Sequence, residues 1–136
     1  MHAKDIMHRD LKLENLVFRK NGYDRMVTGR ALDSIMIADF GLATRVHEKV
    51  YLYCRCGTPG YVAPEVINVK DMKSTYSSVC DIYSAGLVFH LLLTGKAAFS
   101  GKSYNTVVKM NREAKIDFKA KAFEILPASG IIPQEL

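Results

Sequence analysis

The sequence has few cysteines, and their arrangement excludes several classes of protein. Three cysteines, an odd number, do not make a disulfide framework, and no signal peptide precedes them. Cys54 and Cys56 lack the second pair of ligands that a structural zinc site needs. We therefore expect an intracellular, reducing environment, in the cytoplasm or alternatively in the nucleus.

Long apolar runs are also absent. The longest, residues 82–93, is too short to cross a bilayer and contains His90, so we expect no membrane partner. A helix buried in a folded core explains this run better, with His90 at or near the core. The 136 residues, with 49% hydrophobic and 24% charged side chains, suffice for one globular domain with a core.

Acidic residues are outnumbered in one segment. The net charge is +5, and most of it comes from residues 102–121. This segment holds Lys102, Lys109, Arg112, Lys115, Lys119 and Lys121 against Glu113 and Asp117. Its only aromatic residues are Tyr104 and Phe118, whereas nucleic-acid binding favours basic residues interleaved with aromatic ones. We therefore interpret the segment as a solvated helix face and expect no nucleic-acid partner.

Residues 6–15 combine acidic, basic and amide side chains between apolar flanks. Asp10 can accept the proton of an alcohol, and Lys12 can neutralise a transferring phosphate. The amide of Asn15 offers an oxygen suited to a hard cation such as Mg²⁺. Aspartate and asparagine are also common in turns, so this spacing alone leaves a structural interpretation open.

Further motifs follow in order along the chain. Asp39-Phe40-Gly41 comes after a short apolar stretch, residues 34–38, that we expect to form a strand. Residues 57–62 read Gly-Thr-Pro-Gly-Tyr-Val, and residues 63–65 read Ala-Pro-Glu. Together with residues 8–15, these motifs resemble the C-terminal lobe of a eukaryotic serine/threonine protein kinase. Residues 57–65 are most similar to the calcium/calmodulin-dependent kinase group.

The resemblance implies a fold and an activity. The fold is a mainly α kinase C-terminal lobe with one small β-hairpin, truncated so that the N-terminal lobe and the last helices are absent. The activity is phosphorylation of serine or threonine in proteins, with ATP and Mg²⁺ as cofactors. By resemblance, Asp10 orients and deprotonates the substrate hydroxyl, and Lys12 contacts the γ-phosphate. Asn15 and Asp39 hold the metal ions.

The same resemblance gives supporting roles to neighbouring residues. His8 and Phe40 are expected to be packed structural side chains. Gly41 is expected to supply backbone angles that other residues avoid. Arg9 is expected to bind a phosphate on the activation segment, with an ordinary surface ion pair as the alternative.

Later residues complete the implied site. Thr58 is expected to hydrogen-bond the catalytic aspartate and lysine. Glu65 is expected to pair with an arginine near the end of the lobe, for which the sequence offers no clear candidate. Asp81 has two compatible interpretations, a helix-start carboxylate that caps N–H groups and a contact that fixes the catalytic-loop backbone. The residues expected to line the substrate-docking surface are Gly60, Tyr61 and Val62.

One position departs from the family. Cys54 occupies the place of the phosphorylatable threonine, three residues before the Gly-Thr-Pro motif, so phosphorylation at the usual place is excluded. Arg9 would then lack its usual partner. Redox control at Cys54 or Cys56 is a minor alternative, because cysteines are usually inert unless their pKa is lowered. The hydroxyl residues at other spacings in this segment are Thr44, Tyr51 and Tyr53.

Local patterns predict the elements. Residues 16–38 should form a hairpin around a surface insertion at 19–33, followed by an activation segment, 39–65, without a persistent period. Pro64 is placed to begin a short helix. A helix over about 78–94, buried on all sides, should start with a capping box at Ser78 and Asp81 and end at Gly95. A second helix over 103–112 should precede a divergent tail, 120–136, and its apolar set is Tyr104, Val107, Val108 and Met110.

We expect residues 1–136 to be a partial kinase domain. Only five residues precede Ile6, and the sequence contains no Gly-rich loop, strand lysine or partnering helix glutamate. The implied partners are a protein substrate and a separate N-terminal kinase lobe. The alternative function belongs to another class, a non-catalytic truncated lobe that acts as a protein-binding module.

Overall fold

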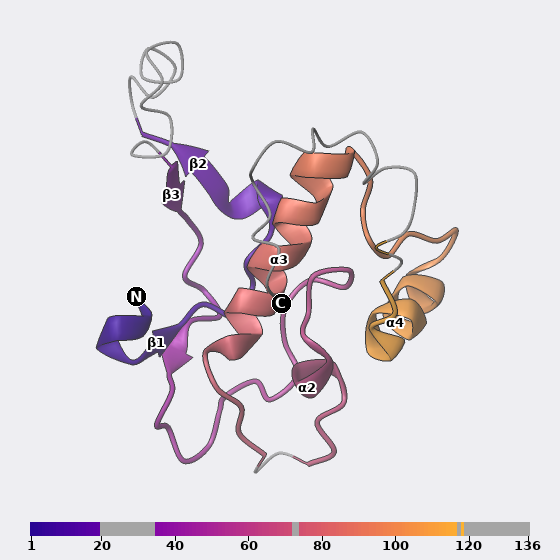
Figure 1. Cartoon of the computed structure of the whole chain (residues 1–136). Helices are drawn as coiled ribbons and strands as arrows, with labels where there is room; N and C mark the ends of the chain where they lie inside the picture. The colour runs from indigo at the N-terminus through magenta and orange to yellow at the C-terminus, as the bar shows by residue number, and fades with distance from the viewer. Residues whose placement is uncertain (20–34, 72–73, 117, 119–136) are drawn as a thin grey trace.

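The computed structural model describes residues 1–19, 35–71, 74–116 and 118. These residues form two 3₁₀ turns, η1 (His2–Lys4) and η2 (Leu13–Asn15), and four short strands. The strands are β1 (Ile6–Met7), β2 (Leu16–Phe18), β3 (Ile35–Ile37) and β4 (Thr44–Arg45). The helices are α2 (Pro64–Ile67), α3 (Val79–Thr94) and α4 (Tyr104–Glu113) (Figure 1). The predicted insertion, apart from Arg19 at its start, and the divergent tail lie outside the described residues.

The strands form two separate two-stranded sheets. β2 and β3 make the expected antiparallel hairpin, with Leu16 opposite Ile37. β1 pairs antiparallel with β4, with Met7 opposite Thr44. The expectation that residues 39–65 contain no regular structure is therefore wrong at residues 44–45. A strand of two residues is too short to show an alternating pattern, so the sequence gives no signal for this pair.

The helix ends largely follow the predictions. α2 has Pro64 in its first turn, where a missing N–H costs nothing. α3 ends at Gly95, whose φ of 68° is left-handed and favours glycine. α4 begins after Ser103, whose hydroxyl oxygen accepts a hydrogen bond from the Thr106 N–H at 3.3 Å.

The start and the exposed face of α3 differ from the prediction. Ser78 makes no side-chain capping hydrogen bond, so the capping box does not form. The described chain packs against one face of α3 only, which makes the expectation of burial on all sides wrong. His90 is half-buried, as expected. The large apolar side chains exposed on the other face are Val79, Ile82, Phe89 and Leu92.

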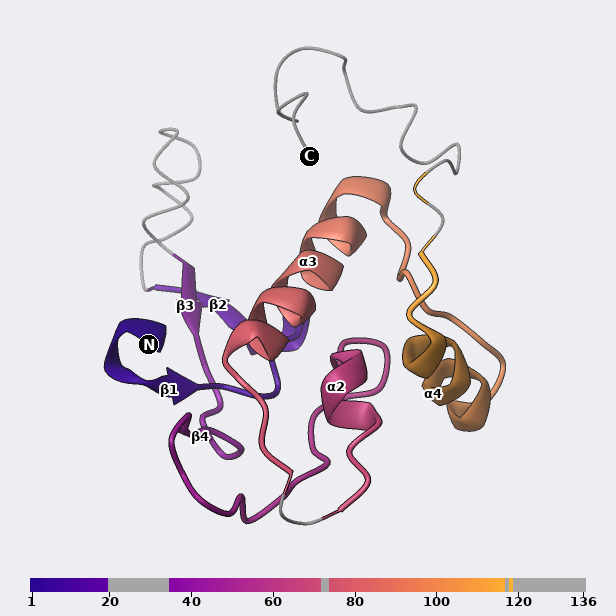
Figure 2. The ribbon, with the colours of Figure 1, turned by 60° about the horizontal axis from the view of Figure 1, so that its bottom comes forward.

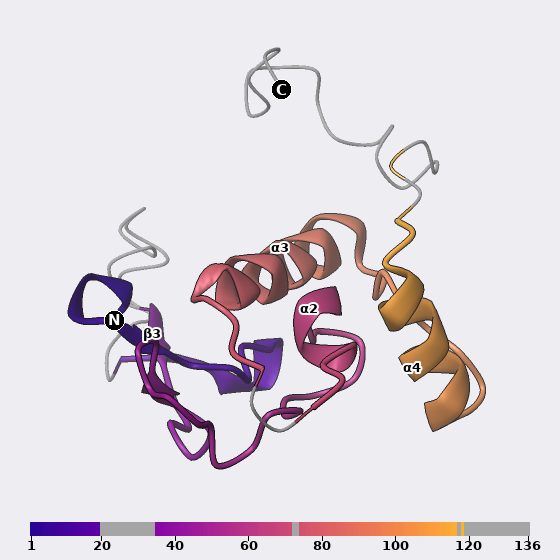
Figure 3. The ribbon, with the colours of Figure 1, turned by 90° about the horizontal axis from the view of Figure 1, so that it is seen from below.

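The core lies where the activation segment meets α2 and the first turn of α3. Tyr51 is 1% exposed there and donates its hydroxyl to the carbonyl oxygen of Tyr76 at 2.8 Å. α2 lies between α3 and α4 (Figures 2 and 3). Among the described helices, none has the length and apolar character needed to span a membrane. The buried members of this core are Met7, Tyr51, Cys54, Val62, Ala63, Val66, Val69 and Cys80.

Candidate active site

Asp81, at the start of α3, fixes the backbone of the loop at residues 8–15. Its buried carboxylate accepts hydrogen bonds from the N–H of His8 at 2.7 Å and of Arg9 at 2.8 Å. Arg9 has a φ of 70°, a left-handed conformation that non-glycine residues rarely adopt. The expected contact between Asp81 and the loop is thus present, whereas the expected capping of the helix is not. Sequence reasoning did not identify His2, whose Nε2 lies 2.8 Å from the same carboxylate.

Asp10, Lys12 and Thr58 form a closed hydrogen-bonded group. The Thr58 hydroxyl donates to Asp10 Oδ1 at 2.7 Å and accepts from Lys12 Nζ at 2.9 Å. Lys12 Nζ also lies 3.0 Å from Asp10 Oδ2. The expected threonine contacts are therefore present. They place a carboxylate that can accept a proton beside an ammonium that can neutralise a phosphate.

Asn15 and Asp39 lie close together because the β2–β3 hairpin continues past its last strand pair. The Ala38 N–H donates to the backbone carbonyl of Asn15 at 2.8 Å, and Asp39 is the next residue. Asn15 Nδ2 donates to the backbone carbonyl of Asp10 at 2.9 Å, which leaves the amide oxygen as an acceptor. Two oxygen donors suit Mg²⁺, which usually takes its remaining ligands from water and phosphate. The described residues contain no group of three or more His, Cys, Asp or Glu that could hold a metal without such ligands.

His8 is a fully buried structural residue, as expected. Its Nε2 lies 3.0 Å from the Ala38 carbonyl oxygen, and its Nδ1 accepts from the Asp10 N–H at 3.2 Å. Phe40 packs edge-on against the His8 ring with centroids 5.1 Å apart, but it is 53% exposed and is therefore not the packed residue predicted.

Gly41 does not adopt the left-handed backbone that the sequence suggested. Asp39 does, with a φ of 61°. Gly41 instead gives room to the carboxylate, because a Cβ at this position would lie 3.1 Å from Asp39 Oδ1. The Gly41 N–H donates to the same oxygen at 3.2 Å and holds it in place.

Arg9 has partners within the activation segment. Its Nε donates to the Leu42 carbonyl and its Nη1 to the Tyr53 carbonyl, each at 2.7 Å. Its guanidinium carbon lies 5.2 Å from the centre of the Tyr51 ring, a cation–π arrangement. Arg9 is 6% exposed, so the surface ion pair is excluded. Backbone carbonyl groups, and not a phosphate, accept these two hydrogen bonds. The chain itself supplies the contacts that tie the activation segment to the loop.

The predicted docking segment is fixed by a residue that sequence reasoning missed. Asn111 of α4 is fully buried, and its Oδ1 accepts from the Gly60 N–H at 2.9 Å. Its Nδ2 donates to the Val62 carbonyl at 2.7 Å. Gly60 has a φ of 94°, which favours glycine. The Ser84 hydroxyl donates to the Tyr61 carbonyl at 2.8 Å, so all three docking residues are held from α3 or α4.

The buried face of α4 differs from the predicted apolar face. Tyr104, one of the predicted apolar set, is 70% exposed, whereas the polar side chain of Asn111 is buried.

We expect Asn111→Ala to lower the free energy of unfolding by about 1–3 kcal/mol, since it leaves a donor and an acceptor without partners. Chemical denaturation measures this change. Asn105→Ala, an exposed asparagine on the same helix, is the matched control and should have little effect. Equal midpoints for the two variants would contradict the role of Asn111.

Two of the three cysteines, Cys54 and Cys80, are buried. Burial, together with the charge of Asp81, raises the pKa of Cys80 to about 12, so its thiol stays protonated near neutral pH. Cys54 is 2% exposed, which argues against an accessible redox group at that position.

Glu65, which was expected to pair with an arginine, is exposed. No cation in the described part of the chain forms an ion pair with it.

Most of the chain is similar in sequence to known proteins. The family model described as "Protein kinase domain" matches residues 1–130, and the chain therefore belongs to the protein kinase family. Serine/threonine-protein kinase 33 of Bos taurus is 41% identical over 121 residues, covering 88% of this chain and 24% of that protein. Calcium-dependent protein kinase 3 of Plasmodium yoelii yoelii is 36% identical over 122 residues, covering 89% and 20%. A probable myosin light chain kinase of Dictyostelium discoideum is 37% identical over 118 residues, covering 87% and 33%.

Proposed function

We propose that this chain is the C-terminal lobe of a serine/threonine protein kinase, and that the assembled kinase transfers the γ-phosphate of ATP to protein hydroxyls with Mg²⁺. The hydrogen-bonded group of Asp10, Lys12 and Thr58 carries the proposal, because it holds a carboxylate that can accept a proton 3.0 Å from an ammonium that can neutralise a phosphate. The similarity to serine/threonine kinases supports the choice of substrate hydroxyl.

The residues of the chain then have distinct tasks. Asp10 orients the substrate hydroxyl and accepts its proton, while Thr58 holds the carboxylate at 2.7 Å. Lys12 neutralises charge on the phosphoryl group. Asn15 and Asp39 would hold Mg²⁺, which supplies positive charge to the phosphate oxygens when bound. Aiming and charge neutralisation are the main requirements of phosphoryl transfer.

The chain spans about a fifth to a third of the length of these curated relatives. We propose that an N-terminal kinase lobe supplies the remaining contacts to the nucleotide. An alternative is a non-catalytic lobe that binds another protein. The exposed apolar side chains of α3 support that alternative, because patches of this kind often mark interaction surfaces.

We expect the purified 136-residue chain to show little stabilisation by Mg²⁺-ATP and no useful turnover on a serine/threonine peptide. Joining an N-terminal kinase lobe ahead of Met1 should restore phosphorylation, measured as radiolabel transfer. The same lobe joined to an active kinase C-terminal lobe controls for the fusion itself. Turnover by the chain alone would show that it needs no second lobe. An inactive fusion beside an active control would favour the binding module.

A further inference from the structure

Three basic side chains surround a hollow between the end of α2 and α4. The hollow has a volume of about 360 Å³. Arg55 comes from the activation segment, Lys70 from the loop after α2, and Arg112 from the last turn of α4. The remaining lining residues are Ile67, Asn68 and Val69. Segments distant in the sequence therefore bring positive charge to one concave place.

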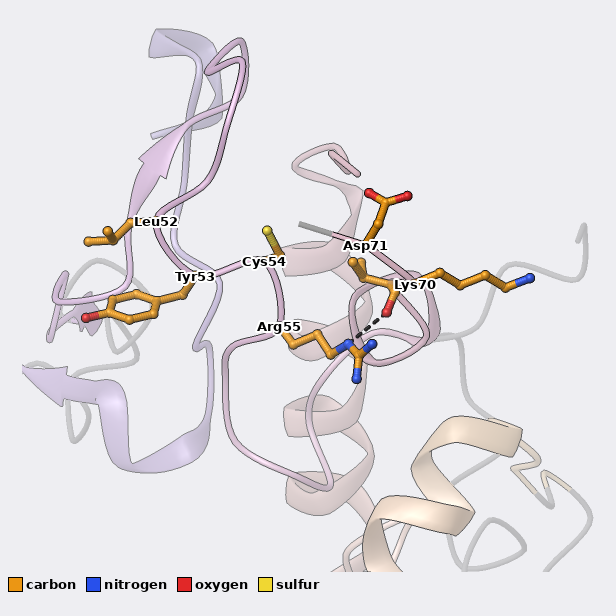
Figure 4. A pocket seen from close by; sticks show the side chains of 7 residues that line it. Leu52, Tyr53, Cys54, Arg55, Lys70 and Asp71 are labelled. Atoms are coloured by element: carbon orange, nitrogen blue, oxygen red, sulfur yellow. Dashed lines mark hydrogen bonds between the residues drawn. The ribbon is translucent and has the colours of Figure 1, made fainter. Parts of the chain in front are cut away.

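An adjoining hollow of about 430 Å³ shares Arg55, Val69 and Lys70 with the first. Figure 4 shows Arg55 reaching from the activation segment towards the loop that carries Lys70 and Asp71. Arg55 Nε donates to the Val69 carbonyl at 2.7 Å. This bond anchors the guanidinium to the wall of the hollow and leaves its four Nη hydrogens for other acceptors.

The positive charge of this hollow is not neutralised within the described residues. The ion pairs among the described residues join His2 to Asp81, Lys12 to Asp10 and His47 to Asp5. None of them involves the three basic residues that line the hollow. Two acids are adjacent in sequence to these residues, Asp71 to Lys70 and Glu113 to Arg112. Asp71 lines the adjoining hollow and accepts hydrogen bonds from the Ser74 N–H and hydroxyl. Within the described residues, neither acid forms an ion pair with the three basic side chains. A basic hollow with unneutralised charge attracts an anionic ligand.

The hollow adjoins the segment that presents the substrate. Arg112 follows Asn111, which holds the backbone of Gly60 and Val62. Arg55 is three residues from Thr58, whose hydroxyl contacts Asp10. Three residues of chain span at most about 10 Å, so a bound peptide reaches both places within a few residues.

We propose that Arg55, Lys70 and Arg112 bind the carboxylates of an acidic segment of the protein substrate, close to the phosphorylated serine or threonine. The assignment of the peptide as a substrate rests on the proposed function, whereas the charge preference of the hollow does not. Arginine suits this task because its planar fork donates two parallel hydrogen bonds to one carboxylate. Ile67 and Val69 supply apolar contact for the methylene groups of a glutamate.

The test is fluorescence anisotropy with the 136-residue chain and two labelled peptides. One carries three glutamates after a central serine, and the matched peptide carries three glutamines. We expect the glutamate peptide to bind about three- to ten-fold more tightly at low salt, since exposed ion pairs contribute small increments each. The difference should shrink at 0.5 M salt, where screening is strong.

Paired variants locate the site. Arg55→Gln with Arg112→Gln should remove most of the preference for glutamate. Lys4→Gln with Lys102→Gln is the control, because it removes the same charge from exposed positions outside the hollow. Circular dichroism should show both variants folded, since all four side chains are exposed.

Three results would overturn the proposal. They are equal affinity for the two peptides, binding of neither peptide, and a preference for glutamate that survives in the Arg55/Arg112 variant. Tighter binding of a single-stranded oligonucleotide than of the glutamate peptide would assign the hollow to nucleic acid instead. An inactive lobe fusion would defeat the proposed function and leave this binding result standing. An active fusion that shows no preference for the glutamate peptide would defeat the proposed peptide site and leave the proposed function standing.

Discussion

Asp10→Asn, made in the lobe fusion, should reduce phosphoryl transfer about 10²- to 10⁴-fold while the fold survives. The amide nearly matches the carboxylate in shape. Thr58 and Lys12 lie 2.7 and 3.0 Å from the carboxylate oxygens of Asp10, so in the variant they still have a neighbour of the same size. An amide cannot accept the proton of the substrate hydroxyl, and general base catalysis is worth this range of rates. Steady-state phosphorylation of a serine peptide measures the loss.

Glu48→Gln is the matched control for this substitution, because it makes the same chemical change at an exposed position of the activation segment. It should keep the parental rate. The unfolding midpoints of both variants, followed by circular dichroism, separate a chemical defect from a folding defect. A rate for Asp10→Asn within a few-fold of the parent would remove Asp10 from the role of base.

Short motifs made much of the candidate site predictable from the sequence. Asp10, Lys12 and Asn15 lie within six residues of one another, so their proximity needs only a single loop. Thr58 joins them across 48 residues, and only the resemblance to a known family suggested that contact. The roles of these residues in catalysis stay predictions until the variants are measured.

Residues that act over long distances without a motif could not be found in this way. Asn111 contacts Gly60 across 51 residues. In the sequence of α4, nothing distinguishes this asparagine from a polar residue on the exposed face of a helix. His2 approaches Asp81 across 79 residues. Neither position has a local pattern, because the contact depends on how separate segments pack together.

The errors have physical causes. Ser78 and Asp81 have capping-box spacing, but two buried backbone N–H groups of the loop take the Asp81 carboxylate instead. The long apolar run of α3 predicted burial on all sides. Hydropathy reports which side chains favour an apolar environment, and it cannot show which of them the described chain covers.

Asp81→Ala should give a large loss of stability. The substitution leaves the N–H groups of His8 and Arg9 without their present acceptor in a buried place. An unsatisfied buried donor costs about 1–3 kcal/mol, so we expect a loss of about 2–6 kcal/mol in the free energy of unfolding. Single domains have only about 5–15 kcal/mol in total, so a substantial unfolded fraction is expected on mild denaturation. Urea unfolding followed by circular dichroism measures the change.

Two further variants distinguish the proposed role of Asp81 from that of an ordinary charge. Asp81→Asn keeps the volume and one oxygen acceptor, but its NH₂ group meets a backbone donor, so its stability should lie between those of Asp81→Ala and the parent. Glu113→Ala removes an exposed carboxylate from the end of α4 and should change little. In the lobe fusion, Asp81→Asn should also lower the catalytic rate more than peptide affinity, because the left-handed turn at Arg9 places Asp10. Parental unfolding midpoints and rates for both Asp81 variants would show that the loop holds its shape without this carboxylate.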